Sequence, residues 1–205
     1  FLLTTAAAVA LISGPALAAQ DAIRLGMVLE PPGLDPTANA AAAIDEITYA
    51  NLFEGLTRFA PDGSIAPALA ESWEAKEGGR VYEFKLHGGV KFHDGADFDA
   101  SDVVFSLDRA RAPDSVNAQK ALFADIEAVE AVAPDLVRVT LKAPDADFPW
   151  KMAWGDAVMM DPASAADAAT KPVGTGPFKL GEWTQGDHVT LTAFEGYWGE
   201  KPVLK

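Results

Sequence analysis

The sequence predicts a mixed α/β fold in which β-hairpins are numerous and helices are inserted between them. Three observations support this prediction. Short apolar segments form pairs around turn residues at 72–86, 126–142 and 178–194. Apolar residues also recur at helical spacing over 43–56 and again after Asp99. Finally, the 205 residues are 49% hydrophobic and 22% charged, which is typical of a globular chain of one or two domains.

The N-terminus has the features of a secretory signal peptide over residues 1–18. An uncharged apolar run is interrupted by Gly14-Pro15, and Ala16-Leu17-Ala18 then supplies an A-x-A cleavage site. The alternative is a membrane anchor, but the run is shorter than the roughly 20 residues that span a bilayer. The chain has no cysteine to acylate, which excludes a lipoprotein. We therefore expect an exported protein that begins near Ala19.

The first elements after this segment are a strand and a helix. Residues 22–30 predict a strand that ends in the proline-stiffened loop EPPGLDP. A helix is expected over 43–56, with Gly55 near its end. Residues 56–76 then predict a strand, a Pro-Asp-Gly turn, a short helical turn and a second strand.

Three hairpins follow from the pairs of apolar segments. In the first, 72–86, one face carries Tyr82, Phe84 and Leu86. The second, 126–142, turns at Pro134-Asp135, and the third, 178–194, turns near Gly186.

A helix is predicted to begin after Asp99. The Asp99 carboxylate fits the N-cap position, and Asp102 lies in the first turn, where the helix dipole favours negative charge. The predicted buried face is Val103, Val104, Leu107 and Ala110, whereas Asp108 and Arg109 are expected to point away. The alternative is a metal or acid/base site built from His87, His93, Asp94, Asp97 and Asp99. Their spacing crosses two turns and matches no metal-ligand pattern, so we favour an architectural role and expect no metal site.

The net charge and the motifs of the sequence narrow the range of possible functions. The net charge of −14 and the lack of a basic cluster disfavour nucleic acid and anionic lipid as partners. The sequence contains no GxSxG elbow, no phosphate-binding loop and no SxxK motif. Residues 174–177, Gly-Thr-Gly-Pro, precede a predicted strand, so a tight backbone crossing is favoured over an anion site. The apolar PWKMAW patch, with Trp150 and Trp154, is a candidate cleft wall.

Three separated blocks resemble the family 5 solute-binding proteins of ABC importers, the oligopeptide, dipeptide and nickel-binding group. The blocks are LEPPGLDP with NLFEGLTRFAPDGSIAPALAESWE, then YEFKLHGGVKFHDGADFDASDVVFSL, then PVGTGPFKLGEW with FEGYWGEKP. The resemblance implies the N-terminal part of a hinged, two-lobed clamshell of the type II periplasmic-binding-protein class. It assigns residues 19–40 and 172–205 to the ligand-facing lobe I and 41–171 to an inserted subdomain, while the second lobe is expected to be missing from this fragment.

The resemblance also implies a function. The expected protein is a periplasmic monomer that binds a small solute and delivers it to an ABC transporter permease, without catalysis or a cofactor. Peptide is the default solute, and nickel chelates, opines and glycosides remain open. A ligand sensor for a membrane receptor and a secreted hydrolase are the alternatives.

The candidate ligand-binding residues lie in the two segments assigned to lobe I. Glu30, Pro31, Pro32 and Leu34 follow the C-terminal end of the first predicted strand, where crevices open in such sheets. The prolines lack N–H donors, so carbonyl groups are left as acceptors beside the Glu30 charge. The family's matching position is similar in placing an acid near bound peptide, and a solvated glutamate is the alternative. Gly174 and Thr175, in the second segment, complete the set.

Overall fold

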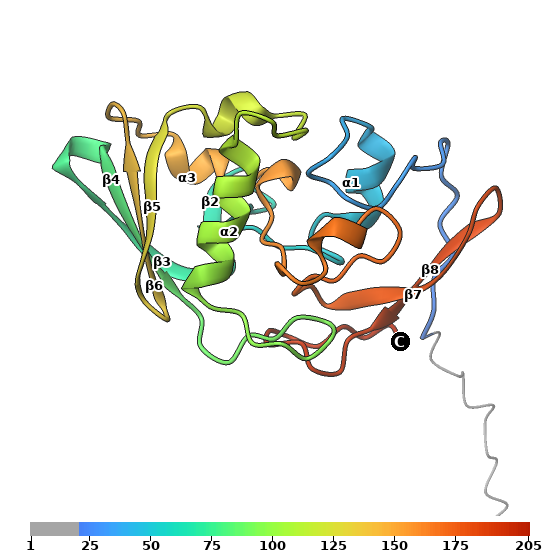
Figure 1. Cartoon of the computed structure of the whole chain (residues 1–205). Helices are drawn as coiled ribbons and strands as arrows, with labels where there is room; N and C mark the ends of the chain where they lie inside the picture. Colours follow the sequence, from blue (N-terminus) through green and yellow to red (C-terminus); the bar gives the residue numbers. More distant parts are fainter. Residues whose placement is uncertain (1–20) are drawn as a thin grey trace, which may run out of the picture.

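The computed structural model describes residues 21–205 and arranges them as a mixed α/β fold, which confirms the predicted class (Figure 1). The predicted signal peptide, 1–18, lies outside the described residues. The described strands form one four-stranded sheet and two separate two-stranded sheets. Within residues 21–205, no helix has the length and apolar character needed to cross a membrane.

The four-stranded sheet joins two of the predicted hairpins, and both are confirmed. Its strand order is β3-β4-β6-β5 and every neighbouring pair is antiparallel. The strands are β3 (Ala70–Lys76), β4 (Val81–Leu86), β5 (Ile126–Ala133) and β6 (Leu136–Leu141). Register shifts interrupt both edge strands, β3 and β5. Such irregularities hinder edge-to-edge pairing with another chain.

One face of this sheet forms the main core. Side chains alternate between faces along a strand, so β4 buries Tyr82, Phe84 and Leu86 together, as predicted. Phe84 lies opposite Val137 of β6, and helix α2 (Ala100–Arg111) packs against the same core (Figure 1). On the other face, Glu83 forms ion pairs with Lys76 and Arg138.

Helix α2 begins as the sequence predicts. The Asp99 carboxylate accepts a hydrogen bond from the Ser101 N–H at 2.7 Å, and the Asp102 carboxylate accepts from the Asp99 N–H at 2.9 Å. This reciprocal arrangement is a capping box. Val103, Leu107 and Ala110 are buried as expected, whereas Val104 is only half-buried. Arg109 was expected to point away into solvent, which is wrong, because its guanidinium binds Asp35 and Thr37.

The first helix is shorter than predicted. Helix α1 (Ala42–Thr48) has seven residues, and Ala50 has a positive φ of 57°, which a helix cannot continue through. The N–H groups of Leu52 and Phe53 bond back to the Thr48 carbonyl at 2.9 and 3.0 Å. Both side chains are fully buried. The apolar spacing therefore predicted burial correctly, but the burial is achieved by a compact turn.

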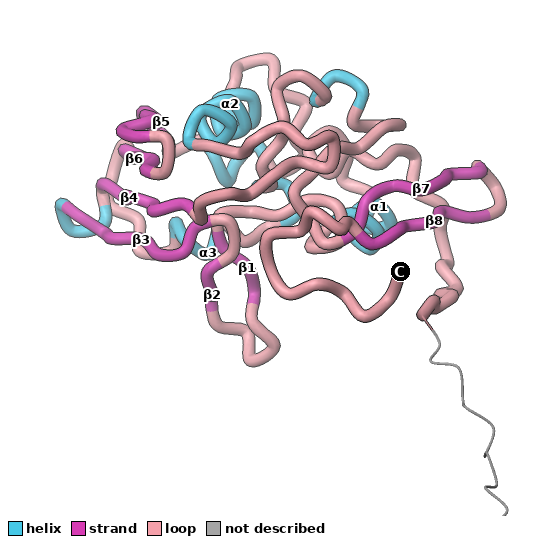
Figure 2. The backbone as a smooth tube through the Cα atoms, turned by 90° about the horizontal axis from the view of Figure 1, so that it is seen from below, coloured by secondary structure: helices cyan, strands magenta, loops and turns pink. Residues whose placement is uncertain are grey.

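The expected helical turn in residues 56–76 is also wrong. Strands β1 (Thr57–Phe59) and β2 (Ile65–Pro67) pair antiparallel around a turn in which Gly63 has φ 83°. Their hairpin projects from the rest of the chain in Figure 2. The remaining short elements are α3 (Phe148–Lys151), η1 (Glu77–Gly79), η2 (Lys120–Phe123), η3 (Gly155–Ala157) and η4 (Ala165–Asp167).

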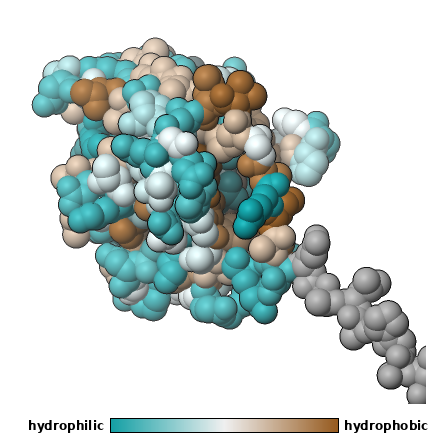
Figure 3. Space-filling view, turned by 90° about the vertical axis from the view of Figure 1, so that its right-hand side faces the viewer, coloured by the Kyte–Doolittle hydropathy of each residue, from teal (hydrophilic) through white to brown (hydrophobic). Residues whose placement is uncertain are grey.

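The predicted first strand, 22–30, is not formed. Its apolar side chains are exposed, including Leu25 at 77% and Val28 at 97%. The third predicted hairpin is confirmed as β7 (Phe178–Thr184) and β8 (His188–Ala193), but in residues 21–205 neither strand pairs with 22–30. A strand needs a partner for its backbone groups, and within residues 21–205 no strand pairs with this segment. Figure 3 looks onto this side of the molecule and shows hydrophobic residues at its surface.

The capping box generates a stability prediction. We expect Asp99→Ala to lower the free energy of unfolding by about 1 kcal/mol, because the Ser101 N–H loses its acceptor. Chemical denaturation would measure the change. Asp97→Ala is the control, since its pair with Lys91 lies at the surface and contributes little. Equal losses for the two variants would contradict the assigned cap.

Candidate functional site

The first predicted site segment, residues 30–34, is anchored at both ends. Glu30 is exposed, and its carboxylate accepts a hydrogen bond from the Gly186 N–H in the β7–β8 turn at 2.8 Å. Leu34 is fully buried and its N–H donates to the Ala169 carbonyl at 2.9 Å. Pro31 is buried and Pro32 is exposed. The structure thus leaves Glu30 and Pro32 open to solvent, and a role for the four residues in ligand binding stays a prediction.

An ion pair between buried Asp35 and half-buried Arg109, which the sequence did not suggest, holds the end of this segment. Asp35 is 5% exposed, and its carboxylate accepts from the Thr37 N–H at 2.8 Å and from Arg109 of α2 at 3.1 Å. A buried carboxylate requires such partners to offset its lost hydration. The contact joins residues far apart in the chain, so no local spacing could have revealed it. It fixes the loop after Leu34 against α2.

The second predicted site segment, residues 174–176, is a tight backbone crossing. The Gly176 N–H donates to the Leu52 carbonyl and the Phe178 N–H donates to the Asn51 carbonyl, both at 3.0 Å. A Cβ on Gly174 would overlap the Leu52 carbonyl oxygen, so only glycine permits this approach. The crossing favoured from sequence is therefore confirmed. Thr175 is fully buried within it, and ligand binding by Gly174 and Thr175 stays a prediction.

His93 binds two backbone groups of this crossing. Its Nδ1 accepts from the Gly174 N–H at 3.2 Å, and its Nε2 lies 3.1 Å from the Gly176 carbonyl oxygen. This pattern fits a neutral ring with its proton on Nε2. Burial lowers the pKa of His93 from 6.5 to about 4, so the ring stays neutral at pH 7. Both ring nitrogens are thus engaged with backbone groups, which supports the architectural role.

Glu54 was missed by the sequence analysis and lies beside the same crossing. Its Oε2 accepts from the Thr175 hydroxyl at 2.9 Å and from Trp198 Nε1 at 3.0 Å. Its Oε1 accepts from the Tyr197 hydroxyl at 2.9 Å. Burial raises the pKa of Glu54 above its usual value, and the three donors act in the opposite direction. We call this arrangement of Glu54, Thr175, Tyr197 and Trp198 the Glu54 cluster.

The apolar patch proposed as a cleft wall, residues 149–154, exposes Trp150 but buries Met152 and Ala153. Trp150 is 41% exposed, and its ring centroid lies 5.2 Å from Trp154 and 6.0 Å from Phe59. Both contacts are between neighbouring rings, and Phe59 belongs to strand β1 of the β1–β2 hairpin. Among the ring contacts and hydrogen bonds of residues 21–205, none joins Trp150 or Trp154 to the Glu54 cluster.

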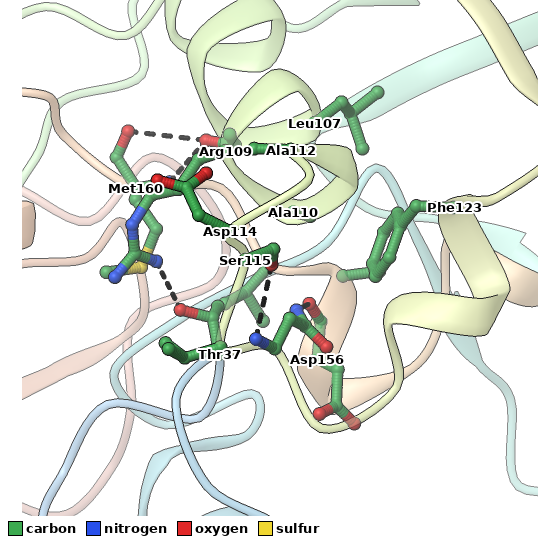
Figure 4. A pocket seen from close by; sticks show the side chains of 15 residues that line it. Thr37, Leu107, Arg109, Ala110, Ala112, Asp114, Ser115, Phe123, Asp156 and Met160 are labelled. Atoms are coloured by element: carbon green, nitrogen blue, oxygen red, sulfur yellow. Dashed lines mark hydrogen bonds between the residues drawn. The ribbon is translucent and has the colours of Figure 1, made fainter.

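A separate pocket of about 180 Å³ opens between the end of α2 and the loop that follows it (Figure 4). Apolar side chains such as Leu107, Phe123 and Met160 form part of its wall. Its buried Asn117 is satisfied, because Nδ2 donates to the Asp156 carbonyl at 2.9 Å. Burial, together with the charge of Asp45, raises the pKa of Asp156 to about 6. None of the predicted ligand-binding residues lines this pocket.

The chain as a whole has counterparts in known proteins. The family model described as bacterial extracellular solute-binding proteins, family 5 middle, matches residues 64–205. The chain belongs to this family. The resemblance predicted from the three sequence blocks is thereby confirmed.

Two relatives indicate how much of a family 5 protein the chain represents. It is 36% identical over 203 residues to the glutathione-binding protein GsiB of Pectobacterium atrosepticum, covering 97% of this chain and 39% of the relative. For GsiB of Escherichia coli K12, the identity is 33% over 195 residues, with 93% and 38% covered. The chain therefore spans about two fifths of the length of these curated relatives.

Solved family 5 structures share the fold. The binding protein AgaA from Agrobacterium strain R10, in complex with agropinic acid, superposes with a TM-score of 0.78 at 30% identity, covering 83% of this chain and 35% of AgaA. AppA from Bacillus subtilis, in complex with a nonapeptide, gives 0.79 at 28% identity, covering 87% and 37%. The predicted fold class, the N-terminal part of a type II binding protein, is confirmed.

The crossing generates the second prediction. We expect Gly174→Ala to destabilise the chain by about 2–3 kcal/mol, because the added methyl group forces the two backbones apart. Thermal and denaturant unfolding would measure this loss. Gly88→Ala is the matched control, since no atom lies within 4 Å of a Cβ at that position. Equal stability of the two variants would contradict the close approach.

Proposed function

We propose that this protein captures a small solute outside the cytoplasm and delivers it to an ABC transporter permease. The observation that carries the proposal is the family 5 match over residues 64–205. Relatives and structural neighbours are named for binding glutathione, a peptide and a nickel–histidine complex. None of these names describes a reaction, so we infer a binding protein and not an enzyme.

The geometry supports the proposed division into a ligand-facing lobe I, 19–40 with 172–205, and an inserted subdomain, 41–171. Two contacts join the separated parts of lobe I. The Gly186 N–H donates to Glu30, and the Lys205 N–H donates to the Asp21 carbonyl at 2.8 Å. In Figure 1 the N-terminal segment, in blue, passes beside the β7–β8 hairpin.

Binding follows from closure of two lobes around the solute. Closure removes the solute from water, so a few polar groups fix its orientation and apolar walls fill the remaining space. No bond in the solute changes. We infer a peptide-like solute with an ammonium group near Glu30, since that exposed carboxylate keeps one oxygen, Oε2, free of the Gly186 bond. Export to the periplasm follows from the predicted signal peptide, 1–18.

The function is tested with protein expressed from the complete reading frame. Calorimetry would titrate it with glutathione, a tetrapeptide, nickel–histidine and agropinic acid, the solutes found with its relatives. We expect saturable binding of a peptide-like member and unchanged solute on recovery. Uptake of the same solute should fall in cells that lack the gene. Chemical conversion of the solute, or unchanged uptake, would contradict the proposed role.

Glu30 generates the fourth prediction. We expect Glu30→Gln to weaken binding of a cationic solute on the order of ten- to a hundredfold, the effect of losing a charge-assisted hydrogen bond. The glutamine carbonyl can still accept from the Gly186 N–H, so the melting temperature should stay unchanged. Equal losses for cationic and neutral solutes would instead indicate a structural role for Glu30.

A further inference from the structure

The Glu54 cluster joins segments that are far apart in the sequence. Three donors converge on one carboxylate, and they lie 121 to 144 residues beyond Glu54. Within residues 21–205, no lysine or arginine forms an ion pair with Glu54. The carboxylate is therefore held by neutral hydrogen-bond donors. It brings Thr175, Tyr197 and Trp198 together around one side chain.

The chemistry of these donors suits a carboxylate, which only accepts, although the two hydroxyl groups can also accept. The Trp198 indole N–H can only donate. Burial and the neighbouring Glu54 raise the pKa of Tyr197, so its hydroxyl keeps its proton and also donates. An ionised carboxylate offers about four lone-pair sites, enough for all three donors. A protonated carboxyl group would point its own hydrogen toward one of them.

The three donors lie at the two ends of the β7–β8 hairpin. Thr175 comes three residues before β7 begins at Phe178, and Tyr197 and Trp198 follow shortly after β8 ends at Ala193. Glu54 thus holds both ends of the hairpin at its base. Two neighbours reinforce the base, because the His93 ring contacts residues 174–176 and the Trp198 ring lies 4.5 Å from the His87 ring.

The turn of the hairpin, opposite its base, contacts Glu30. The Gly186 N–H in the β7–β8 turn donates to the Glu30 carboxylate, so the direction of the hairpin sets where that carboxylate lies. Figure 1 shows the hairpin extending from the body of the chain toward the N-terminal segment. The contacts form a continuous path from Glu54, through the base and strands of the hairpin, to Glu30.

We propose that Glu54 is a positioning residue for the solute site: it fixes the base of the β7–β8 hairpin, and the hairpin in turn positions Glu30. This inference rests on the proposed function, since it takes Glu30 as a solute contact. Glu54 itself does not touch the solute. It acts by restricting the hairpin to one orientation, which lowers the cost of ordering the site when the solute binds.

Three readouts on protein from the complete reading frame test this role. Hydrogen exchange measures how well the backbone amides of the hairpin are protected. The indole N–H resonance of Trp198 reports whether its hydrogen bond to Glu54 is intact. Calorimetry with glutathione or a tetrapeptide measures the affinity for the solute. We expect Glu54→Ala to speed amide exchange in β7 and β8 at least tenfold, to move the Trp198 resonance and to weaken solute binding at least fivefold. Glu54→Gln should rescue most of each effect, because its carbonyl still accepts from Trp198 and the Tyr197 hydroxyl can accept from its amide.

Controls separate the possible causes of a change. Glu195→Ala removes the same charge from an exposed side chain beside the cluster, and it should leave all three readouts unchanged. Tyr197→Phe deletes one donor and should give a smaller effect in the same direction, which keeps the test available if Glu54→Ala fails to fold. Unchanged hairpin exchange in both Glu54→Ala and Tyr197→Phe would overturn the positioning role.

The test also separates this inference from the proposed function. If the unaltered protein binds none of the solutes, the proposed function fails, whereas the exchange data still decide whether Glu54 orders the hairpin. Conversely, solute binding that is intact in Glu54→Ala, with a loosened hairpin, would overturn the positioning role and leave the binding function standing.

Discussion

The close crossing of residues 174–176 over residues 51–54 is the constraint on which the rest of the arrangement depends. Two backbone hydrogen bonds of 3.0 Å, to the Leu52 and Asn51 carbonyls, bring the chains together where any side chain on Gly174 would overlap. Such an approach leaves no room for water, so every polar group beside it needs a protein partner. Glu54 and His93 supply partners of this kind.

Two kinds of polar group are used at this crossing, each suited to its place. His93 presents one acceptor and one donor to two backbone groups of opposite type, which requires a neutral imidazole. Glu54 presents only acceptors to three donors, which suits an ionised carboxylate. Burial opposes charge at both positions: it depresses the pKa of the histidine and raises that of the glutamate. The histidine is neutral, which is the form that burial favours. For the glutamate, three hydrogen bonds stabilise the charged form that burial disfavours.

The parts of the chain differ in how deeply their apolar residues are buried. The sheet β3-β4-β6-β5 and helix α2 bury most of the apolar core, with aromatic side chains such as Phe84 and Phe92 fully enclosed. The segments 21–40 and 172–205, in contrast, expose apolar residues and touch one another at Glu30 and Asp21. A well-packed sheet thus stands beside a less enclosed region formed by the two chain segments.

The sequence by itself determined many of the local structural elements of this protein and its family. The hairpin segments, the buried face of β4 and the Asp99 cap were predictable because alternation, turn residues and capping act over a few residues. Family membership was also readable from three blocks of sequence. Only the tertiary structure decided the rest. Helix α1 stops early because Leu52 and Phe53 are buried by a turn, and residues 22–30 form no strand without a partner. The Arg109–Asp35 pair and the Glu54 cluster depend on contacts across 74 to 144 residues, a separation that no local pattern records.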